Sequence, residues 1–384
     1  MCKIKTAFIT GARSEYGLLY PVLRTFKNSP EFEFILVVTG SHLSPIFGLT
    51  KNEIIKDGFE ISAEVPFHID SDLDDSLPLS LGQGIIQFVQ VFKNLNPDVI
   101  FVLGDRVEIL SASLAALFLK IPVAHIHGGD NTSFLIPDTY IRHSISKIAH
   151  FHFPATENSK ENLIKMGEDE KRIFVVGNLG LYSLDLREIQ EYEEIREKYN
   201  LYPKKKYALL IHHPHPYERK NSLEELKLIV HTLYKYNIPF VAISPNTDPG
   251  GREMYNFFYS ESLKGKFLLF DNFPFREYLS LMKNAKFMIG NSSSALYEAG
   301  FFKVPVINVG GRQKLRERGG YVYDAERIED IEMCVKKIIN GELPEFIPLP
   351  FKRIRGDLKI KKVILRFFKR YSKKEIFQKK LNIK

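Results

Sequence analysis

The sequence predicts an α/β fold of two doubly wound, Rossmann-like domains that face each other across a cleft. Short apolar runs, typical of buried parallel strands, alternate with segments of helical periodicity along most of the 384 residues. Many of these runs end in glycine and polar residues, and open parallel sheets bind ligands at that end of their strands. We predict an N-terminal domain over 1–180, a C-terminal domain over 181–355, and a segment, 356–384, with a helix packing back on the first domain and a basic tail.

The first predicted unit is a strand at Lys5–Thr10, a glycine turn and a helix from Leu18. This order opens many nucleotide-binding units, in which the helix N-terminus receives a phosphate. Arg13 in the turn suits a diphosphate, although a surface arginine is an equal alternative. The turn lacks G-x-G-x-x-G, so a dinucleotide is not indicated. Further strands are predicted at 34–40, ending near His42, and at 61–65, 99–103, 121–124, 151–153 and 173–178, with helices at 51–56, 81–95 and 157–166.

Ionisable side chains follow the two neighbouring strands at 99–103 and 121–124. Because the carboxyl ends of parallel strands meet at one edge, we expect these groups to converge on one cleft, as acid–base chemistry on a small substrate requires. The alternative is a set of satisfied ion pairs, but the adjacent glycines suggest backbone close to a ligand. The groups are Asp105, Arg106, Glu108, His125, His127, Asp130, Asp138, Arg142 and His143.

The second half repeats the pattern after a charged connection at 188–206. Strands are predicted at 207–211, 240–244, 287–290 and 304–309, with helices at 224–235 and around Glu298. The polar residues and glycines that follow these strands are His212, His213, His215, Asn246, Asp248, Gly250, Gly251, Arg252, Asn291, Ser292, Ser293, Ser294, Gly310, Gly311 and Arg312.

Three successive serines, Ser292–Ser294, stand where a helix is predicted to begin. An ordinary N-cap needs one serine, so three favour a phosphate held by backbone N–H groups and hydroxyls. Glu298, one turn further on, would reach ribose hydroxyls. The histidines at 212–215 do not predict zinc, because Pro214 and Pro216 exclude a helical histidine face and no H-E-x-x-H spacing exists. A histidine at a strand end is expected to act as a general acid–base or phosphate partner.

Charge is unevenly distributed. Residues 351–384 carry 14 Lys and Arg against two acidic residues, so this segment is +12 and the rest of the +8 chain is −4. A mildly acidic body argues against nucleic-acid binding. Cys2 and Cys334 are widely spaced and are expected to be free thiols in a reducing cytoplasm. The tail could make a weak contact with an anionic membrane or a partner enzyme, or simply be solvated.

Several motifs together resemble the UDP-N-acetylglucosamine 2-epimerases, in particular the hydrolysing branch of sialic and legionaminic acid synthesis. They occur in family order across roughly residues 5–320. The motifs are T-G-A-R-S-E-Y-G-L-L from Thr10, T-G-S-H-L-S from Thr39, L-G-D-R from Leu103, H-I-H-G-G-D from His125, Asp138 with R-H-S-I-S-K from Arg142, D-P-G-G-R from Asp248 and G-N-S-S-S from Gly290.

The resemblance implies the two-domain fold of B-type glycosyltransferases and a reaction without redox cofactor or metal. A base removes the C2 proton of the sugar while the nucleoside diphosphate leaves C1; water then adds to the glycal and a free N-acetylmannosamine-type sugar is released. The nucleotide sugar is UDP-N-acetylglucosamine or a UDP- or GDP-linked 2-acetamido derivative, and a homodimer or homotetramer is implied.

By position, the resemblance implies roles for residues in both domains. The acid–base set is Asp105, His127, Asp130, Asp138 and His213; the nucleotide contacts are Arg13, His42, Asn246, Gly251, Arg252, Ser292, Ser293, Ser294, Glu298 and Arg312; the sugar contacts are Arg106, Arg142 and His143. The N-terminal domain would thus hold the sugar and the C-terminal domain the nucleotide.

Three departures from relatives leave points open. Many relatives carry glutamate where His127 stands, so the C2 base is His127, Asp130 or Asp138. Residues 133–137, Ser-Phe-Leu-Ile-Pro, replace a glycine-rich loop and suit a less polar sugar, such as a 6-deoxy or 4-acetamido one. Thr139 follows Asp138 where relatives usually have a second acid. The competing functions are a non-hydrolysing epimerase, a B-type glycosyltransferase that needs an acceptor, and an inactive nucleotide-sugar-binding protein.

Overall fold

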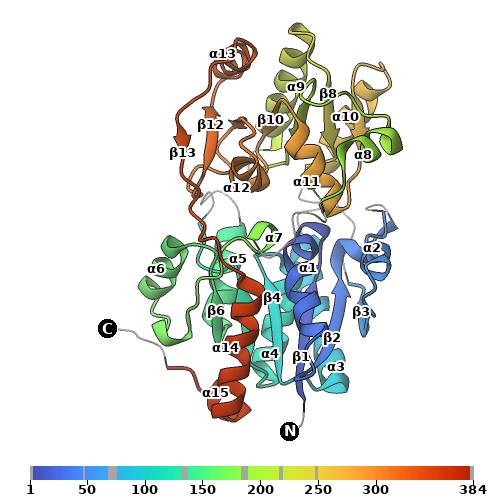
Figure 1. The fold of residues 1–384 in the computed structure, drawn as a ribbon. Coiled ribbons are helices and arrows are strands. Elements are labelled where there is room, and N and C mark those ends of the chain that lie inside the picture. The colour runs from blue at the N-terminus through green and yellow to red at the C-terminus, as the bar shows by residue number, and fades with distance from the viewer. Residues whose placement is uncertain are drawn as a thin grey trace.

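The structure is a computed structural model that describes residues 3–45, 48–67, 76–131, 137–182, 189–215, 219–246 and 250–380. Two α/β domains lie one above the other, each built on a largely parallel sheet with helices on both faces (Figure 1). This arrangement confirms the predicted fold class. None of the described helices has both the length and the apolar character needed to cross a membrane.

The N-terminal domain contains a six-stranded parallel sheet in the order β3-β2-β1-β4-β5-β6. Its elements are β1 (Ile4–Thr10), α1 (Arg13–Lys27), β2 (Phe32–Thr39), the 3-10 turn η1 (Gly40–Leu43), α2 (Lys51–Lys56), β3 (Ala63–Val65), α3 (Ser76–Leu95), β4 (Val99–Leu103), α4 (Val107–Phe118), β5 (Val123–Ile126), α5 (Pro137–Ile148), β6 (Phe151–Phe153), α6 (Glu157–Lys165), the 3-10 turn η3 (Glu170–Arg172) and α7 (Leu179–Tyr182).

Side chains of β1 alternate between the two faces of this sheet. Phe8 lies in the core shared with α1, while Ala7 and Ile9 lie in the core shared with α3, α4 and α5. Such strands are apolar on both faces, which is why they appear in the sequence as continuous apolar runs. Their carboxyl ends all point toward the second domain (Figure 1).

The C-terminal domain contains a seven-stranded sheet in the order β13-β12-β11-β10-β7-β8-β9, parallel except for β13. Its elements are α8 (Tyr192–Tyr199), β7 (Ala208–Ile211), α9 (Arg219–Lys235), β8 (Phe240–Ile243), α10 (Gly251–Ser262), β9 (Leu268–Phe270), α11 (Phe275–Asn284), β10 (Phe287–Gly290), α12 (Ser293–Phe301), β11 (Val306–Val309), β12 (Gly320–Ala325), α13 (Ile328–Ile339) and β13 (Phe346–Ile347). The chain then returns to the first domain in α14 (Gly356–Arg370) and α15 (Lys373–Phe377).

The strand predicted at 173–178 is wrong. Only Ile173 forms an isolated bridge, with His152, although the N–H of Val176 still donates to the carbonyl of Pro154 at 2.9 Å. Pro154 has no N–H to return a second hydrogen bond, so a regular ladder cannot continue beside it. The strands at 268–270, 320–325 and 346–347 were not predicted, because they are short or half-exposed.

The two domains meet at a close contact between α11 and two glycines of the first domain. The ring of Phe275 lies over Gly17 of α1 and Gly180 of α7, so closely that a β-carbon at Gly17 would stand 2.5 Å from it. The N–H of Phe275 donates to Glu53 Oε1 of α2 at 3.2 Å. Only residues without a side chain allow this approach, so the glycines set the distance between the domains.

The basic tail packs against the N-terminal domain. Ile376 is buried, and the ring of Phe377 stacks on His150 at 4.6 Å between centroids. Lys379 Nζ reaches the buried carboxylate of Glu168 at 2.7 Å and the backbone carbonyl of Ala149 at 2.7 Å. These apolar and cationic groups are therefore engaged within the chain itself.

We expect Lys379→Met to lower the free energy of unfolding by about 2 kcal/mol, because it removes one partner of a carboxylate that is almost fully buried. His152 and Lys147 also contact Glu168, at 3.0 and 2.8 Å, which limits the loss. Urea denaturation followed by circular dichroism measures the change. Lys380→Met is the matched control, since Lys380 is exposed; equal effects of the two variants would contradict the prediction.

Candidate active site

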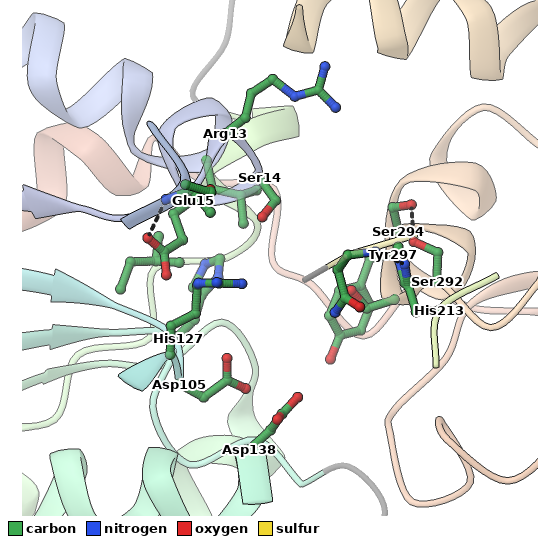
Figure 2. A pocket seen from close by; sticks show the side chains of 18 of the residues that line it. Arg13, Ser14, Glu15, Asp105, His127, Asp138, His213, Ser292, Ser294 and Tyr297 are labelled. Carbon is green, nitrogen blue, oxygen red and sulfur yellow. Dashed lines mark hydrogen bonds between the residues drawn. The ribbon is translucent and has the colours of Figure 1, made fainter. Parts of the chain in front are cut away.

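A cavity of about 460 Å³ lies between the domains, lined from both sides by residues that follow strand ends. In Figure 2, Asp105, His127 and Asp138 lie on one wall, and His213, Ser292, Ser294 and Tyr297 lie on the other. The predicted site residues that line it are Arg13, Asp105, Arg106, His127, Asp130, Asp138, Arg142, His213, Asn246, Ser292, Ser293, Ser294, Glu298 and Arg312. The two sets of strand ends therefore converge as the sequence predicts.

His42 and His143 do not line this cavity. The 3-10 turn after β2 directs His42 into the domain, where its ring lies between the hydroxyls of Thr10 and Thr50 at 3.0 and 2.7 Å. Burial lowers the pKa of His42 to about 3, so its ring is neutral and holds the turn in place. His143 lies five residues beyond Asp138 on α5, with Nε2 2.9 Å from Asn131 Oδ1.

Gly251 and Arg252 also lie outside the lining. Gly251 begins α10, and a β-carbon there would stand 2.3 Å from the carbonyl oxygen of Asn246. It therefore supports Asn246, which does line the cavity. Arg252 is exposed on α10. Asp248, the other polar residue expected in this loop, lies outside the described residues.

Asp105 follows β4 after Gly104 and is held by Arg142 of α5. The Arg142 guanidinium is almost fully buried; it forms an ion pair with Asp105 Oδ2 and donates to the backbone carbonyl of Asp130 at 3.0 Å. The bonds fix a carboxylate and a guanidinium together at the cavity wall.

Asp130 contacts two residues of the opposite domain. Its Oδ2 accepts from the hydroxyl of Tyr297 at 2.8 Å and from Nε of Arg316 at 3.0 Å. The pattern of strand ends did not indicate Tyr297 or Arg316. Arg316 stands four residues past Arg312 in the same glycine-rich turn, and this position is the signal that could have identified it. No feature of the sequence of α12 indicates that the Tyr297 hydroxyl makes a contact in the site.

Asp138 is the second residue of α5 and is partly exposed. Its Oδ2 lies 3.8 Å from Arg312 Nη2 of the opposite domain, with the Asp138 side chain 29% exposed. Asp138 therefore reaches solvent and the cavity at once, unlike Asp130.

His127 stands in a left-handed backbone conformation, with φ of 59°, which side-chain-bearing residues rarely adopt. Its Nε2 is buried and has no hydrogen-bond partner among the described residues. Burial lowers the pKa of His127 to about 4, against the opposing influence of Asp130 and of the carbonyl of Gly177 beside the ring. A neutral imidazole with an unused nitrogen in a cavity is suited to accept a proton.

The position of the ring proton of His213 follows from a backbone hydrogen bond. Its Nδ1 accepts a hydrogen bond from the N–H of Asn246 at 3.2 Å, so the proton of the neutral ring is assigned to Nε2. Burial, with Arg312 nearby, holds the pKa of His213 well below its usual range. The side chain of Asn291 bonds both the N–H and the carbonyl of His213, at 2.7 and 2.9 Å, and fixes its backbone. His213 is therefore a hydrogen-bond donor.

The serines begin α12, where the helix dipole favours an anion. Ser292 and Ser294 lie 3.0 Å apart by their hydroxyls, and Tyr278 lies 2.5 Å from Ser294. Further along the helix, Glu298 accepts from Asn178 Nδ2 at 3.0 Å, and burial raises the pKa of Glu298 to about 7.

Arginines supply positive charge to the same cavity. Arg13 at the start of α1 is partly buried, and its buried Nη1 has no hydrogen-bond partner among the described residues. Burial lowers the pKa of Arg13 to about 10, so it remains charged at neutral pH. The cavity is also lined by Arg106, Arg142, Arg312 and Arg316. Guanidinium groups and a helix N-terminus suit a diphosphate. Among the described residues, no group of three or more His, Cys, Asp or Glu side chains is arranged to hold a metal ion.

Known structures share this two-domain arrangement. The UDP-N-acetylglucosamine 2-epimerase of Methanocaldococcus jannaschii, solved with UDP-N-acetylglucosamine and UDP, superposes with a TM-score of 0.78 at 22% identity over 95% of this chain and 100% of that one. The Neisseria meningitidis UDP-N-acetylglucosamine 2-epimerase bound to UDP-N-acetylglucosamine gives 0.79 at 18% identity, with the same coverage. At these identities the likeness shows the fold.

Sequence comparison identifies the family. The model of the UDP-N-acetylglucosamine 2-epimerase family matches residues 24–363. A Legionella pneumophila protein named UDP-N,N'-diacetylbacillosamine 2-epimerase (hydrolyzing) is 35% identical over 322 residues, 84% of this chain and 85% of that protein. A Campylobacter jejuni GDP/UDP-N,N'-diacetylbacillosamine 2-epimerase (hydrolyzing) is 36% identical over 350 residues, 90% of each. The chain belongs to the UDP-N-acetylglucosamine 2-epimerase family and to its hydrolysing branch.

Proposed function

We propose that this protein is a hydrolysing nucleotide-sugar 2-epimerase. It converts a UDP-linked 2-acetamido sugar and water into UDP and the free sugar inverted at C2, of the N-acetylmannosamine type, for nonulosonic acid synthesis. The observation that carries the proposal is the composition of the cavity between the domains. One wall holds a neutral proton acceptor, His127, and the opposite wall holds a neutral hydrogen-bond donor, His213, and a helix N-terminus.

His127 is the proposed base at C2. Asp130 is bound by Tyr297 and Arg316, whereas the Nε2 lone pair of His127 is unused. Nε2 takes the C2 proton, the C1–O bond to the diphosphate breaks, and the C–H electron pair forms the C1–C2 double bond of the glycal. The carbonyl of Gly177 next to the ring favours the Nδ1–H tautomer that leaves this lone pair on Nε2.

The leaving diphosphate is stabilised from the second wall. His213 donates from Nε2–H, the serine hydroxyls and N–H groups at the start of α12 add donors, and Arg13 and Arg312 contribute positive charge. These groups interact more strongly with the negative charge that develops on the departing oxygen than with the bound substrate, so they lower the barrier of the reaction. Glu298 is proposed to bind the ribose hydroxyls.

Water adds to C1 in the second step, and a proton returns to C2 from the face opposite His127. Inversion at C2 needs a second proton donor, because one group on one face would restore the original configuration. Asp138 fills this role, since it reaches both solvent and the cavity. Asp105, held by Arg142, directs the attacking water and takes up its proton.

The sugar is proposed to carry an acetamido group at C4 and a methyl group at C6, as in diacetylbacillosamine. The two relatives above are named for that sugar. Support from the cavity comes from the apolar residues Phe67, Leu77 and Ile141, which line its N-terminal side and would accept methyl groups. Of the loop 133–137, which is expected to contribute a similar surface, residues 133–136 lie outside the described residues.

A proton NMR time course in D2O tests the function. UDP-N-acetylglucosamine, its 4-acetamido-4,6-dideoxy analogue and the GDP counterparts are supplied in turn. We expect UDP and a free manno-configured sugar with deuterium at C2, fastest with the dideoxy analogue. Deuterium at C2 of an intact nucleotide sugar would instead mean a non-hydrolysing epimerase. Line broadening without turnover would indicate an inactive binding protein or a transferase that awaits its acceptor.

The assembly and location of the enzyme are further parts of the proposal. A homodimer or homotetramer is inferred from the family, and light scattering of the purified chain tests it. A cytoplasmic location is consistent with Cys334, a buried free thiol. Within residues 371–380, a weak membrane or partner contact of the tail would use the exposed lysines, because Ile376 and Phe377 are packed against the first domain. Liposome binding with and without the residues after Tyr371 tests that contact.

A further inference from the structure

The carboxylate of Asp130 joins the two domains inside the cavity. Its Oδ2 accepts from Tyr297 on α12 and from Arg316 in the turn between β11 and β12, at 2.8 and 3.0 Å. The side chains of Asp130 and Arg316 are only 14% and 9% exposed. Burial, and then the charge of Asp130, raise the pKa of Tyr297 well above its usual value, so its hydroxyl stays a donor.

The same turn contacts the first domain a second time. Glu317, next to Arg316, accepts from the hydroxyl of Thr156 at 2.5 Å, and Thr156 caps α6 through the N–H of Ser159. The Arg316 guanidinium also lies 5.3 Å from the centre of the Tyr297 ring. Two neighbouring residues of opposite charge thus bind two separate points of the first domain. Both contacts depend on the distance between the two domains seen here.

These contacts lead to the predicted catalytic carboxylate. Arg142 donates to the backbone carbonyl of Asp130 at 3.0 Å, and its other terminal nitrogen pairs with Asp105. Arg142 Nη1 also lies 3.8 Å from Asp130 Oδ2. One guanidinium therefore has Asp130 at one end and Asp105 at the other, so the orientation of Asp105 depends on how Asp130 is held.

We propose that Tyr297 and Arg316 are positioning residues of the epimerase reaction. By binding Asp130 when the domains close, they set Arg142 and through it Asp105, so that the site reaches its reactive geometry only with the C-terminal domain seated on the first. The inference rests on the proposed function. It gives Asp130, which the sequence offered as a base, a structural task instead.

The test compares Tyr297→Phe and Arg316→Gln with wild type. Tyr297→Phe keeps the ring that packs edge-on against Phe351 at 4.9 Å between centroids and removes only the hydroxyl. Arg318→Gln is the matched control, because Arg318 pairs with Asp324 inside its own domain. We expect kcat to fall by about 10²-fold for Arg316→Gln and by roughly 10-fold for Tyr297→Phe, since a small misplacement of a reacting group has effects of this size. Arg318→Gln should match wild type.

Two further readouts separate positioning from a general loss of structure. The dissociation constant for UDP, measured by calorimetry, should rise by much less than kcat falls, because both residues bind Asp130 rather than the nucleotide. Adding Asp130→Asn to Arg316→Gln should cost little more than either change alone, since both act through one carboxylate. A parallel loss of UDP affinity and kcat, multiplicative losses in the double variant, or full activity of Arg316→Gln would each overturn the inference.

Small-angle X-ray scattering measures the overall dimensions of each variant and so tests domain closure without any need for turnover. Wild type with saturating UDP should be more compact than Arg316→Gln with UDP, whereas Arg318→Gln should match wild type. Equal dimensions for all three would contradict the coupling. If wild type released no UDP from any donor, the proposed function would fail, but scattering would still decide whether these residues hold the domains closed.

Discussion

Replacing Asp105 by asparagine is expected to lower kcat by at least about 10³-fold while the protein stays folded. The amide has the same shape as the carboxylate, so packing around β4 is kept, but it cannot take a proton from water. Arg142 loses the carboxylate of Asp105 and keeps its contacts with the carbonyl and the carboxylate of Asp130. The measurement is UDP release under saturating substrate, together with the thermal midpoint.

The control for Asp105→Asn is Asp98→Asn. Asp98 accepts from the N–H of Lys5 at 2.9 Å, at the opposite end of the same sheet, away from the cavity. A folded Asp105→Asn protein with near-normal turnover would remove Asp105 from the mechanism. Loss of activity in Asp98→Asn as well would show that any lost carboxylate in this domain has the same effect.

Replacing His127 by asparagine is expected to have a similarly large effect, about 10³- to 10⁴-fold on kcat, because the C2 proton loses its acceptor. Asparagine is the right replacement, since it tolerates the left-handed backbone conformation at φ of 59°. Deuterium incorporation at C2 should stop, and UDP affinity should stay within a few-fold of wild type. His143→Asn, outside the cavity lining, is the matched control.

The pH profile gives a second reading of the same residue. Burial lowers the pKa of His127 to about 4, so the neutral, proton-accepting form is present at pH values above 4 and is lost as the pH falls through 4. We expect the acid limb of kcat/KM near pH 4 instead of near the usual histidine value of about 6.5. An acid limb at 6.5 that His127→Asn leaves in place would assign it to another group.

Much of the site could be predicted because it depends on strand ends. A parallel strand that is apolar on both faces is conspicuous in the sequence, and the residues just after it must lie at one edge of the sheet. Asp105 and His213 were found in this way, and both line the cavity. The family resemblance placed His42 there as a nucleotide contact, but the 3-10 turn rotates its ring toward Thr10 and Thr50.

Other contacts could not be predicted because they join distant parts of the chain. Tyr297 meets Asp130 across 167 positions, and Arg316 does so across 186. Within its helix, Tyr297 has the spacing of an ordinary core residue. Asp130 was likewise a candidate base because it follows His125 and His127 in the sequence. Its side-chain hydrogen bonds come from Tyr297 and Arg316 of the other domain, which no local pattern shows.

The return of the chain to its starting domain has a consequence for how the protein is made. Ile360 and Ile364 of α14 belong to the same core as Phe8, and the contacts of Lys379 come later still. All the strands of the second sheet, in contrast, lie within 208–347. During synthesis the second domain therefore has its complete core first, while the first domain waits for the residues of α14 and α15. Residues 356–377 must therefore be synthesised before the two walls of the cavity can be matched.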